Sequence, residues 1–443
     1  MTRGTAKMEV ETAVLEYRHL PPGLSRKDLV RIQEEGLRLT VERAHAGSAF
    51  YRERLKNAGI GPGDIKSLRD LARLPLTDAA DLASDYPLPL LSVPVEDVAR
   101  VHSSSGTTER RKIFAYTQKD LADWRDLFAR SLEIAGVGRG DRVQIAAGFG
   151  IWTAGAGFQE ACESVGAMAI PVGSGNLDLQ CRFLIDLKPT VICSTASMAL
   201  LLAEEAGRRR LTGQLSVRKM IQGGERFTEA MRRRVRDLLG VEDIYDLSGM
   251  TELYGPGMGI ECSQHSGIHY WSDAYILEIL DPKTLKPVPE GTIGEMVVTS
   301  LKKEATPLIR YRTHDLTRLV PGKCACGLPF PRHDRLMGRD DDMFVFRAVN
   351  IYPGQIEEIL SSFRVLSSEY NVILERKYGR DFMTILVERD PEADPLKDEN
   401  VEAEISHRIK SLVLVSVEVR VVDYASLKRS EGRPVRVFDR RSE

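Results

Sequence analysis

Between residue 100 and roughly residue 240, short apolar runs alternate with charged amphipathic segments, and this alternation limits the chain to few architectures. Val143–Ala147, Ala167–Val172 and Thr190–Cys193 are apolar and strand-like, whereas Leu121–Ile134 and Thr228–Leu239 have the apolar spacing of helices. Strands that alternate with helices in this way are typical of a largely parallel sheet covered by helices. The region therefore predicts an α/β fold.

The segments before and after this region have different patterns. Residues 1–100 are mostly helical, with apolar residues at helical spacing from 25 to 55. Tyr275–Leu280 and Gly294–Thr299 instead alternate apolar with polar residues, which predicts antiparallel strands. We expect mixed sheets with helices and a small antiparallel subdomain.

A charged stretch at residues 332–342 divides the chain. Beyond it, Asn350–Phe363 has a helical pattern, and short strand-like runs follow that helix. We predict a large N-terminal domain, residues 1–340, and a small α+β C-terminal domain, residues 341–443.

The composition excludes several classes of protein. The 443 residues include 62 Lys and Arg against 64 Asp and Glu, a net charge of −2, which argues against binding to nucleic acid or anchoring to a membrane through basic residues. No apolar run reaches the roughly 18 residues of a membrane span, and the start lacks the apolar core of a signal peptide. Six cysteines without a disulfide framework favour a reducing compartment, so we expect a cytoplasmic protein.

The sharpest local motif is the run Ser103-Ser104-Ser105-Gly106-Thr107-Thr108, followed by basic residues at 110–112. Hydroxyl and backbone N–H groups donate to phosphate oxygens, and the basic residues offset phosphate charge. The pattern suits a polyphosphate, but it is not the GxxxxGK[ST] loop of ordinary P-loop NTPases. A solvated turn is the alternative interpretation.

Three further motifs follow this loop, at Ser248–Gly257, Ile309–Asp315 and 338–353. In this order and at these separations, the motifs resemble the adenylate-forming superfamily, and in detail its phenylacetate-CoA ligase branch. The resemblance covers essentially the whole chain. It implies a two-step reaction, in which ATP and a small-molecule carboxylic acid give an acyl-adenylate and pyrophosphate, and CoA then attacks to give a thioester and AMP.

The resemblance also implies roles for individual residues. Glu252 would bind Mg²⁺, which stabilises negative charge on phosphate oxygens. Asp315 is similar to an aspartate that accepts both ribose hydroxyls, and Arg339 is similar to an arginine near the ribose and phosphate. The other residues implied against the nucleotide are Ser104, Ser105, Gly106, Thr107 and Thr108 in the phosphate loop, Gly223, Gly224 and Glu225 beside adenine, and Asp246, Ser248, Gly249, Met250 and Thr251 in the segment that borders its other face.

The small C-terminal domain of this family rotates between the two steps, so the resemblance makes residues 341–443 a mobile lid. Asp341 matches the hinge, and the polar stretch around it suits an exposed linker, although a plain solvated linker has the same composition. The family's tail carries a lysine that assists adenylation. Arg433 stands in its place here and Lys428 lies close by, so both are candidate catalytic residues. Relatives are often dimers, and a homodimer stays open.

A second kind of site is indicated by Cys262-x6-His269 and Cys324-x-Cys326. Three sulfurs and one imidazole form a closed tetrahedral set for Zn²⁺, with no open position for catalysis, so we expect a structural zinc site. His265 gives a tighter spacing to Cys262 and is a rival ligand, although some members of the ligase branch have a pattern that favours His269. Two unrelated loops with free thiols are the alternative.

The acyl pocket is predicted in the glycine-rich stretch 147–157. The resemblance places Phe149, Trp152 and Gly155 along the carboxylate substrate, and aromatic walls with glycine spacing suit a flat apolar acid. We therefore expect an aryl or arylacetic acid. Packing of these aromatic rings in the core is the alternative.

Departures from the family pattern keep three hypotheses open. Glu109-Arg110 replaces Gly-Lys, Ser248 replaces an aromatic residue that flanks adenine, Ala348 replaces a glycine of the pantetheine tunnel, and Arg433 replaces lysine. The preferred hypothesis is an acid–CoA ligase. An adenylate-forming enzyme that passes acyl or AMP to another acceptor is favoured by Ala348, and a catalytically idle scaffold by Arg433 and Glu109.

Overall fold

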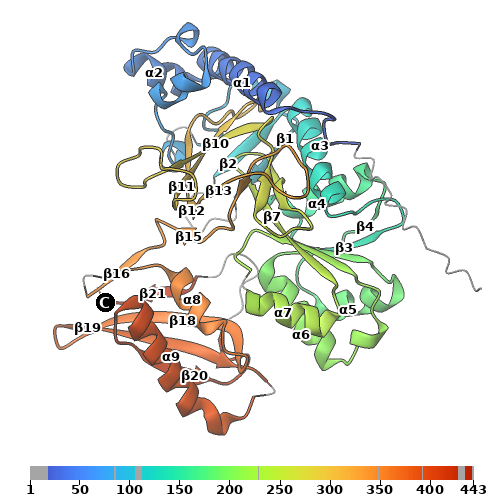
Figure 1. The fold of residues 1–443 in the computed structure, drawn as a ribbon, viewed down its shortest axis with the longest axis vertical. Helices are drawn as coiled ribbons and strands as arrows, with labels where there is room; N and C mark the ends of the chain where they lie inside the picture. The colour runs from blue at the N-terminus through green and yellow to red at the C-terminus, as the bar shows by residue number, and fades with distance from the viewer. Residues whose placement is uncertain are drawn as a thin grey trace, which may run out of the picture.

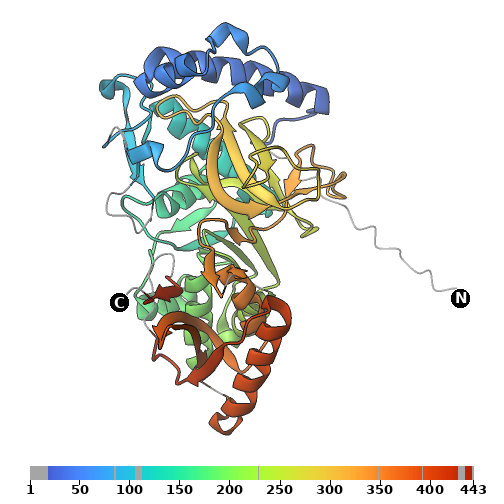
Figure 2. The ribbon, with the colours of Figure 1, turned by 90° about the vertical axis from the view of Figure 1, so that its left-hand side faces the viewer.

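The computed structural model describes residues 18–83, 86–104, 112–227, 229–347, 349–391, 393–427 and 435–441. Figures 1 and 2 show N-terminal helices at one end of the molecule, sheets in its middle and the C-terminal domain at the other end. None of the described helices is long and apolar enough to cross a bilayer.

The central element is a nine-stranded sheet with strand order β13-β14-β9-β8-β7-β6-β5-β3-β4. Its parallel half consists of β3 (Arg142–Ala146), β4 (Met168–Ile170), β5 (Val191–Ser194), β6 (Lys219–Gly223) and β7 (Asp243–Met250). Its antiparallel half consists of β8 (Gly255–Glu261), β9 (Ile268–Tyr270), β13 (Leu319–Val320) and β14 (Arg332–His333). The predicted α/β class is confirmed, with the parallel strands in the region where the sequence alternates.

In the described part of this region, one helix directly precedes the first parallel strand, β3, and four helices connect the parallel strands. They are α3 (Gln118–Ile134), α4 (Ala154–Ser164), α5 (Leu177–Asp186), α6 (Ala196–Arg208) and α7 (Glu229–Leu239). Helix α3 begins with a capping box, in which Thr117 Oγ1 accepts from the Asp120 N–H and the Asp120 carboxylate accepts from the Thr117 N–H, both at 3.0 Å. Trp124 and Phe128 on its inner face are fully buried.

The predicted antiparallel subdomain is a four-stranded sheet with order β10-β11-β12-β15. The strands are β10 (Tyr275–Leu280), β11 (Gly294–Ser300), β12 (Tyr311–Thr317) and β15 (Gly338–Arg339). The connection from β10 to β11 is largely exposed, whereas residues 301–310 between β11 and β12 are buried except Lys302 and Glu304, which are half-buried. Helices α1 (Arg26–Gly47) and α2 (Ala49–Asn57) lie over this end, and β1 (Arg100–Ser103) pairs with β2 (Ile113–Tyr116).

Short 3₁₀ helices join these elements at Pro62–Asp64, Leu68–Arg73, Asp81–Ala83, Val95–Asp97, Thr212–Gln214 and Pro395–Lys397. The C-terminal domain contains β16 (Phe344–Phe346), β17 (Val349–Ile351), α8 (Pro353–Leu360), β18 (Leu366–Lys377), β19 (Arg380–Arg389), α9 (Asp398–Val413), β20 (Glu418–Val422) and β21 (Val437–Asp439). This domain has its own hydrophobic core. The predicted boundary at 340/341 falls between β15 of the large domain and β16.

The C-terminal domain lies against α6 and α7 of the large domain (Figure 1). Arg234 on α7 forms an ion pair with Asp390 at 2.5 Å between Nη2 and Oδ2, and also pairs with Glu204 on α6 at 3.2 Å. The Tyr424 hydroxyl donates to the other oxygen of Glu204 at 3.0 Å. Arg226 Nη1 donates to the Gly354 carbonyl of α8 at 2.5 Å. Polar contacts therefore hold the two domains in this arrangement.

Candidate active site

The carboxyl ends of β6 and β7 bring the two segments predicted beside adenine together. These strands are parallel and in register, with Gln222 opposite Asp246 and Gly223 opposite Leu247. A Cβ at Gly223 would lie 2.7 Å from the Leu247 carbonyl oxygen, so the close approach of the strands requires glycine there. Ligands of open α/β sheets bind outside the carboxyl ends of the strands, which is where these segments lie.

The carboxylates of Glu225 and Asp246, one in each segment, both have polar partners within the protein. The Glu225 carboxylate accepts from the Ser197 N–H at 2.8 Å, and burial raises the pKa of Glu225. Asp246 is buried and accepts from Arg232 Nη2 at 2.7 Å. Arg335 Nε also lies 3.0 Å from the same Asp246 oxygen. Burial raises the pKa of Asp246 despite these arginines.

The same two arginines contact Glu261, which is fully buried, with Arg232 at 3.1 Å and Arg335 at 2.7 Å. Burial opposes ionisation of Glu261, but hydrogen bonding from His265 and the two guanidinium groups hold its pKa below the usual range. The hydrogen bond to Glu261 in turn raises the pKa of His265.

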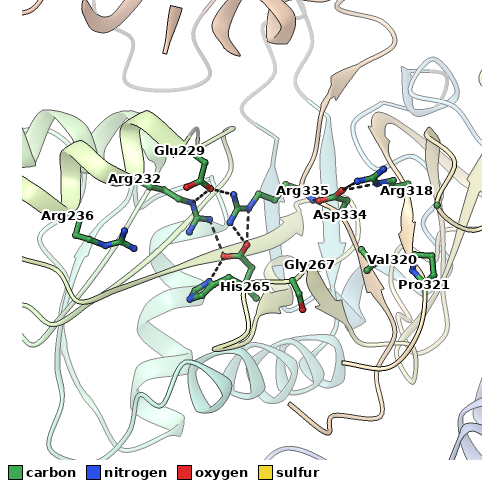
Figure 3. Close-up of a pocket in the computed structure, with 13 residues that line it drawn as sticks. Glu229, Arg232, Arg236, His265, Gly267, Arg318, Val320, Pro321, Asp334 and Arg335 are labelled. Carbon is green, nitrogen blue, oxygen red and sulfur yellow. Dashed lines mark hydrogen bonds and ion pairs between the residues drawn. The ribbon is translucent and has the colours of Figure 1, made fainter. Parts of the chain in front are cut away.

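These side chains border a cavity of about 790 Å³ (Figure 3). Its walls also carry Glu229, Arg236, Arg318 and Asp334. Arginines and carboxylates alternate around it and form ion pairs with each other, as the dashed lines in Figure 3 show. The charged side chains that line the cavity are therefore linked by ion pairs, an arrangement that does not suit the binding of a strongly charged anion.

The turn after β7 carries Glu252, and several side chains fix its main chain. The Tyr116 hydroxyl donates to the Thr251 carbonyl at 2.7 Å, and the Thr251 and Thr153 hydroxyls lie 3.2 Å apart. Lys303 Nζ donates to the Glu252 carbonyl at 2.8 Å. Burial lowers the pKa of Lys303 to about 7. Sequence reasoning missed Lys303, because a lysine in the segment 301–310 gives no signal of burial.

The Glu252 carboxylate faces β12, where the Tyr311 hydroxyl donates to its Oε1 at 3.5 Å. Along the same strand, Asp315 is opposite Arg339 of β15. Arg339 Nη1 lies 3.5 Å from the Asp315 carboxylate and Nη2 lies 2.5 Å from that of Asp341. The structure thus brings the predicted ribose and phosphate residues together on one short strand pair, with the predicted hinge residue just after it.

A polar cluster beside the hinge also escaped the sequence analysis. His314 Nδ1 lies 2.7 Å from Asp340 Oδ1, and Arg312 Nη2 lies 2.7 Å from the fully buried Glu295. Residues 312 and 314 share one face of β12. The period-2 spacing of the arginine and the histidine in Arg-Thr-His is the sequence signal that predicts this shared face. The cluster anchors the residue that precedes Asp341.

The predicted acyl-pocket residues lie next to the nucleotide segments. A Cβ at Gly155 would lie 2.6 Å from the Phe149 ring, and one at Gly224 would lie 3.8 Å from the Trp152 ring. Phe149 is 39% exposed, which is high for an aromatic ring that only packs in a core. The two aromatic rings therefore lie near the carboxyl ends of the strands, beside the segment predicted to border adenine.

Several predicted residues lie outside the described part of the chain. They are Ser105, Gly106, Thr107 and Thr108 of the phosphate loop, Lys428 and Arg433 of the tail, and Ala348. Ser104 is described, and its N–H donates to the Lys112 carbonyl at 3.1 Å. This bond joins the two ends of the predicted phosphate loop.

Cys262, His269, Cys324 and Cys326 converge, with all four ligand atoms within 4.8 Å of one another. The Cys262 and Cys324 sulfurs are 3.6 Å apart, and His269 Nε2 is 3.3 Å from the Cys326 sulfur. Ligands at about 2.3 Å from a tetrahedral Zn²⁺ would be about 3.7 Å apart, so the geometry fits this ion. His265 is not in the group, since it pairs with Glu261 and Asp243.

The remaining ring nitrogen of His269, Nδ1, lies 2.9 Å from the Phe330 carbonyl. Such a bond fixes the tautomer that leaves Nε2 free to bind a metal, as in most histidine ligands of metals. Cys162, Cys181 and Cys193 are buried elsewhere.

Comparison with known proteins places the chain in a family. A model of AMP-binding enzymes matches residues 96–301, and a model of the AMP-binding enzyme C-terminal domain matches residues 348–441. The chain belongs to the AMP-binding enzymes. The predicted resemblance to adenylate-forming enzymes is thereby confirmed.

Among curated relatives, the phenylacetate-coenzyme A ligase of Escherichia coli (strain K12) is 38% identical over 422 residues, covering 94% of this chain and 95% of the relative. That of Pseudomonas putida is 38% identical over 414 residues, covering 92% of this chain and 93% of the relative. The similarity of this family member to these ligases therefore extends over both domains.

Among solved structures, 2-hydroxyisobutyryl-CoA ligase in the postadenylation state with 2-HIB-AMP is 27% identical, with a TM-score of 0.87 over 96% of this chain and 95% of that chain. The same enzyme in the thioesterification state, with 2-HIB-AMP and CoA, has a TM-score of 0.69 at 28% identity and the same coverage. Because both structures are of one enzyme, the difference reflects conformation. The domains described here are arranged more like those of the postadenylation state.

Proposed function

We propose that this protein is an AMP-forming acid–CoA ligase that activates an aryl or arylacetic carboxylate. The observation that carries the proposal is that the Gly223–Glu225 segment and the Glu252 turn follow the neighbouring strands β6 and β7, and that Glu252 contacts β12, the strand on which Asp315 lies opposite Arg339. These segments are far apart in the sequence. The similarity to phenylacetate-coenzyme A ligases over both domains supports the same activity.

In the first step, a carboxylate oxygen of the acid attacks the α-phosphorus of ATP, and the bond to the β-phosphate bridging oxygen breaks to release pyrophosphate. Asp315 would accept both ribose hydroxyls, since a carboxylate takes two donors at once. Arg339 lies beside it as a cation for the phosphate. Glu252 offers a hard oxygen ligand that fits Mg²⁺, and that ion supplies charge neutralisation on the phosphates when bound.

In the second step, the CoA sulfur, as thiolate, attacks the acyl carbon of the adenylate. The bond between that carbon and the phosphate oxygen breaks, and AMP leaves. This step needs a different position of the C-terminal domain, and the linker after β15 supplies the pivot at Asp341. Phe149 and Trp152 would enclose the acyl group, and the lack of a side chain at Gly155 lets the Phe149 ring lie against the start of α4.

We also propose that Cys262, His269, Cys324 and Cys326 hold a structural Zn²⁺. The support is the donor set, the ligand separations and the Phe330 carbonyl behind His269. With four protein ligands, the ion would join the β8–β9 hairpin to the loop before β14 and leave no open position for substrate. Light scattering would test whether the protein forms the homodimer that the resemblance leaves open.

The deciding experiment is mass spectrometry of one reaction. The purified chain is incubated with ATP, Mg²⁺, CoA and a pool of aryl, arylacetic and short aliphatic acids. We expect a new aryl- or arylacetyl-CoA with one AMP for each thioester. Pyrophosphate and acyl-adenylate without thioester would instead support transfer to another acceptor, and no turnover would support the idle scaffold.

The matched variants are Glu252→Gln and Glu290→Gln, the second in the exposed β10–β11 connection. We expect Glu252→Gln to lower AMP formation by about 100-fold or more, because it removes a ligand of the ion that offsets charge in the transition state. Glu290→Gln should match the wild type. Equal activity of the two variants would contradict the role of Glu252.

A further inference from the structure

Lys303 is a buried lysine in the connection between β11 and β12. Its side chain is fully buried, and its Nζ lies 4.5 Å from the centre of the Tyr116 ring and 5.4 Å from that of Phe114. The Tyr254 ring is 5.8 Å away. Burial of a lysine is unfavourable unless partners compensate, and aromatic faces attract an ammonium group. Because burial of this lysine is unfavourable, its position among three aromatic rings indicates a specific role.

The ammonium group is directed at the turn that carries Glu252. Lys303 Nζ donates to the Glu252 carbonyl at 2.8 Å, and the Tyr116 hydroxyl donates to the preceding carbonyl, of Thr251, at 2.7 Å. Lys303 and Tyr116 also contact each other through the cation–π interaction. Two neighbouring carbonyls are thus fixed by two mutually packed side chains, so the main chain of Glu252 has little freedom to rotate.

The main chain next to Lys303 is held just as firmly. The Asp120 carboxylate accepts from the Glu304 N–H at 2.7 Å and from the Ala305 N–H at 2.9 Å. Asp120 is buried and belongs to the capping box of α3. A continuous set of bonds therefore runs from the start of α3 through Lys303 to the backbone of Glu252.

We propose that Lys303 is a positioning residue for adenylation, which aims the Glu252 carboxylate by holding its main chain. The inference rests on the proposed role of Glu252. Lys303 does not touch the reacting atoms in this account. It fixes the direction in which the carboxylate leaves the backbone, and a carboxylate that binds a metal with phosphate tolerates little displacement.

The test separates the two half-reactions in the full-length protein. Lys303→Met keeps the length of the side chain and removes the charge and the donor. Lys302→Met is the matched control, since Lys302 is 34% exposed and faces Asp273 at 3.6 Å. Adenylation is followed by ATP–pyrophosphate exchange over a series of Mg²⁺ concentrations, and thioester formation is followed from preformed acyl-adenylate and CoA.

For Lys303→Met we expect exchange to fall by about 10- to 100-fold, as for a catalytic group displaced by about 1 Å, with half-saturation shifted to higher Mg²⁺. Thioester formation should change less than about threefold. Lys302→Met should match the wild type in both assays. A purely structural role would lower both half-reactions together and leave the Mg²⁺ dependence unchanged, and that result would overturn the proposal.

Tyr116→Phe covers the case in which Lys303→Met does not fold. It removes the donor to Thr251 and keeps the aromatic ring beside Lys303. We expect the same selective loss in exchange, smaller in size, with higher Mg²⁺ needed for half-saturation. Unchanged Mg²⁺ dependence in a folded Tyr116→Phe protein would overturn the proposal. Wild-type turnover decides the proposed function, and the variant-to-wild-type ratio at each Mg²⁺ concentration decides the role of Lys303.

Discussion

The ion pair between Arg234 and Asp390 should bias the balance between the two half-reactions. It joins the domains in the arrangement that resembles the postadenylation state, and rotation of the C-terminal domain would separate the two side chains. The Asp390 side chain is 5% exposed and that of Arg234 is 29% exposed. The pair lies between an exposed pair, worth up to about 1 kcal/mol, and a buried pair, whose disruption costs about 3–5 kcal/mol.

Asp390→Asn should therefore destabilise this arrangement by about 1–2 kcal/mol, which corresponds to about a 5- to 30-fold shift in the domain equilibrium. Changing Asp390 keeps the pair between Arg234 and Glu204 within the large domain intact. The ratio of thioester formation to ATP–pyrophosphate exchange should rise by up to that factor. The control Glu399→Gln, at an exposed position of α9, should leave the ratio unchanged.

A double-mutant cycle with Arg234→Gln completes the test. If the pair acts as described, the effects of the two single variants on the ratio are not additive, because each removes the same interaction. Additive effects, or an equal loss in both half-reactions, would refute the reasoning. In that case the pair would contribute to folding but not to the choice of domain arrangement.

Three further outcomes are expected. The Cys324→Ser protein should contain much less zinc than the wild type by elemental analysis, and it should melt at a lower temperature. The control Cys181→Ala, outside the cluster, should keep the metal. Equal metal content in the two variants would contradict the site. His265→Asn should lower the free energy of unfolding by about 1 kcal/mol more at pH 5.5 than at pH 9. The reason is that folding raises the pKa of His265, so the stabilisation from the protonated ring is lost as the pH rises through that pKa. A pH-independent difference in chemical denaturation would contradict this. Gly155→Ala should raise KM for aryl acids by about 10-fold, because the new methyl group would lie 2.6 Å from the Phe149 ring and 2.8 Å from the Gly148 carbonyl and so displace the ring that lines the pocket. An unchanged KM would place the acyl group elsewhere.

The order of elements is predictable from this sequence because it depends on local pattern, whereas the segments of the nucleotide site were predicted from the family resemblance. The apolar runs Val143–Ala147 and Thr190–Cys193, which alternate with helical segments, predict parallel strands, and the spacing of Cys324 and Cys326 predicts a shared ligand group. The family resemblance favours His269 over His265, and the fold confirms that His269 lies with the cysteines, whereas His265 pairs with Glu261 and Asp243.

The residues that the sequence analysis missed depend on long-range packing. Lys303 is buried by rings from residues 114, 116 and 254, and no local pattern joins these positions. In the same way, the family resemblance implies that Asp246 lies near adenine, but no sequence pattern reveals that Arg232 and Arg335 contact its carboxylate. Tertiary contacts of this kind decide which polar side chains are paired with other residues of the protein.

The two connections of the antiparallel sheet have opposite consequences for protein engineering. The β10–β11 connection is largely exposed, so a fluorophore or a short peptide tag inserted at 283–287 should report on the enzyme without disturbing it. The β11–β12 connection, although formally a loop, is buried like a core strand and bonded to α3 and to the turn after β7. Even a single inserted residue there would shift Lys303 out of its cage, so tolerance to insertion cannot be judged from secondary structure alone.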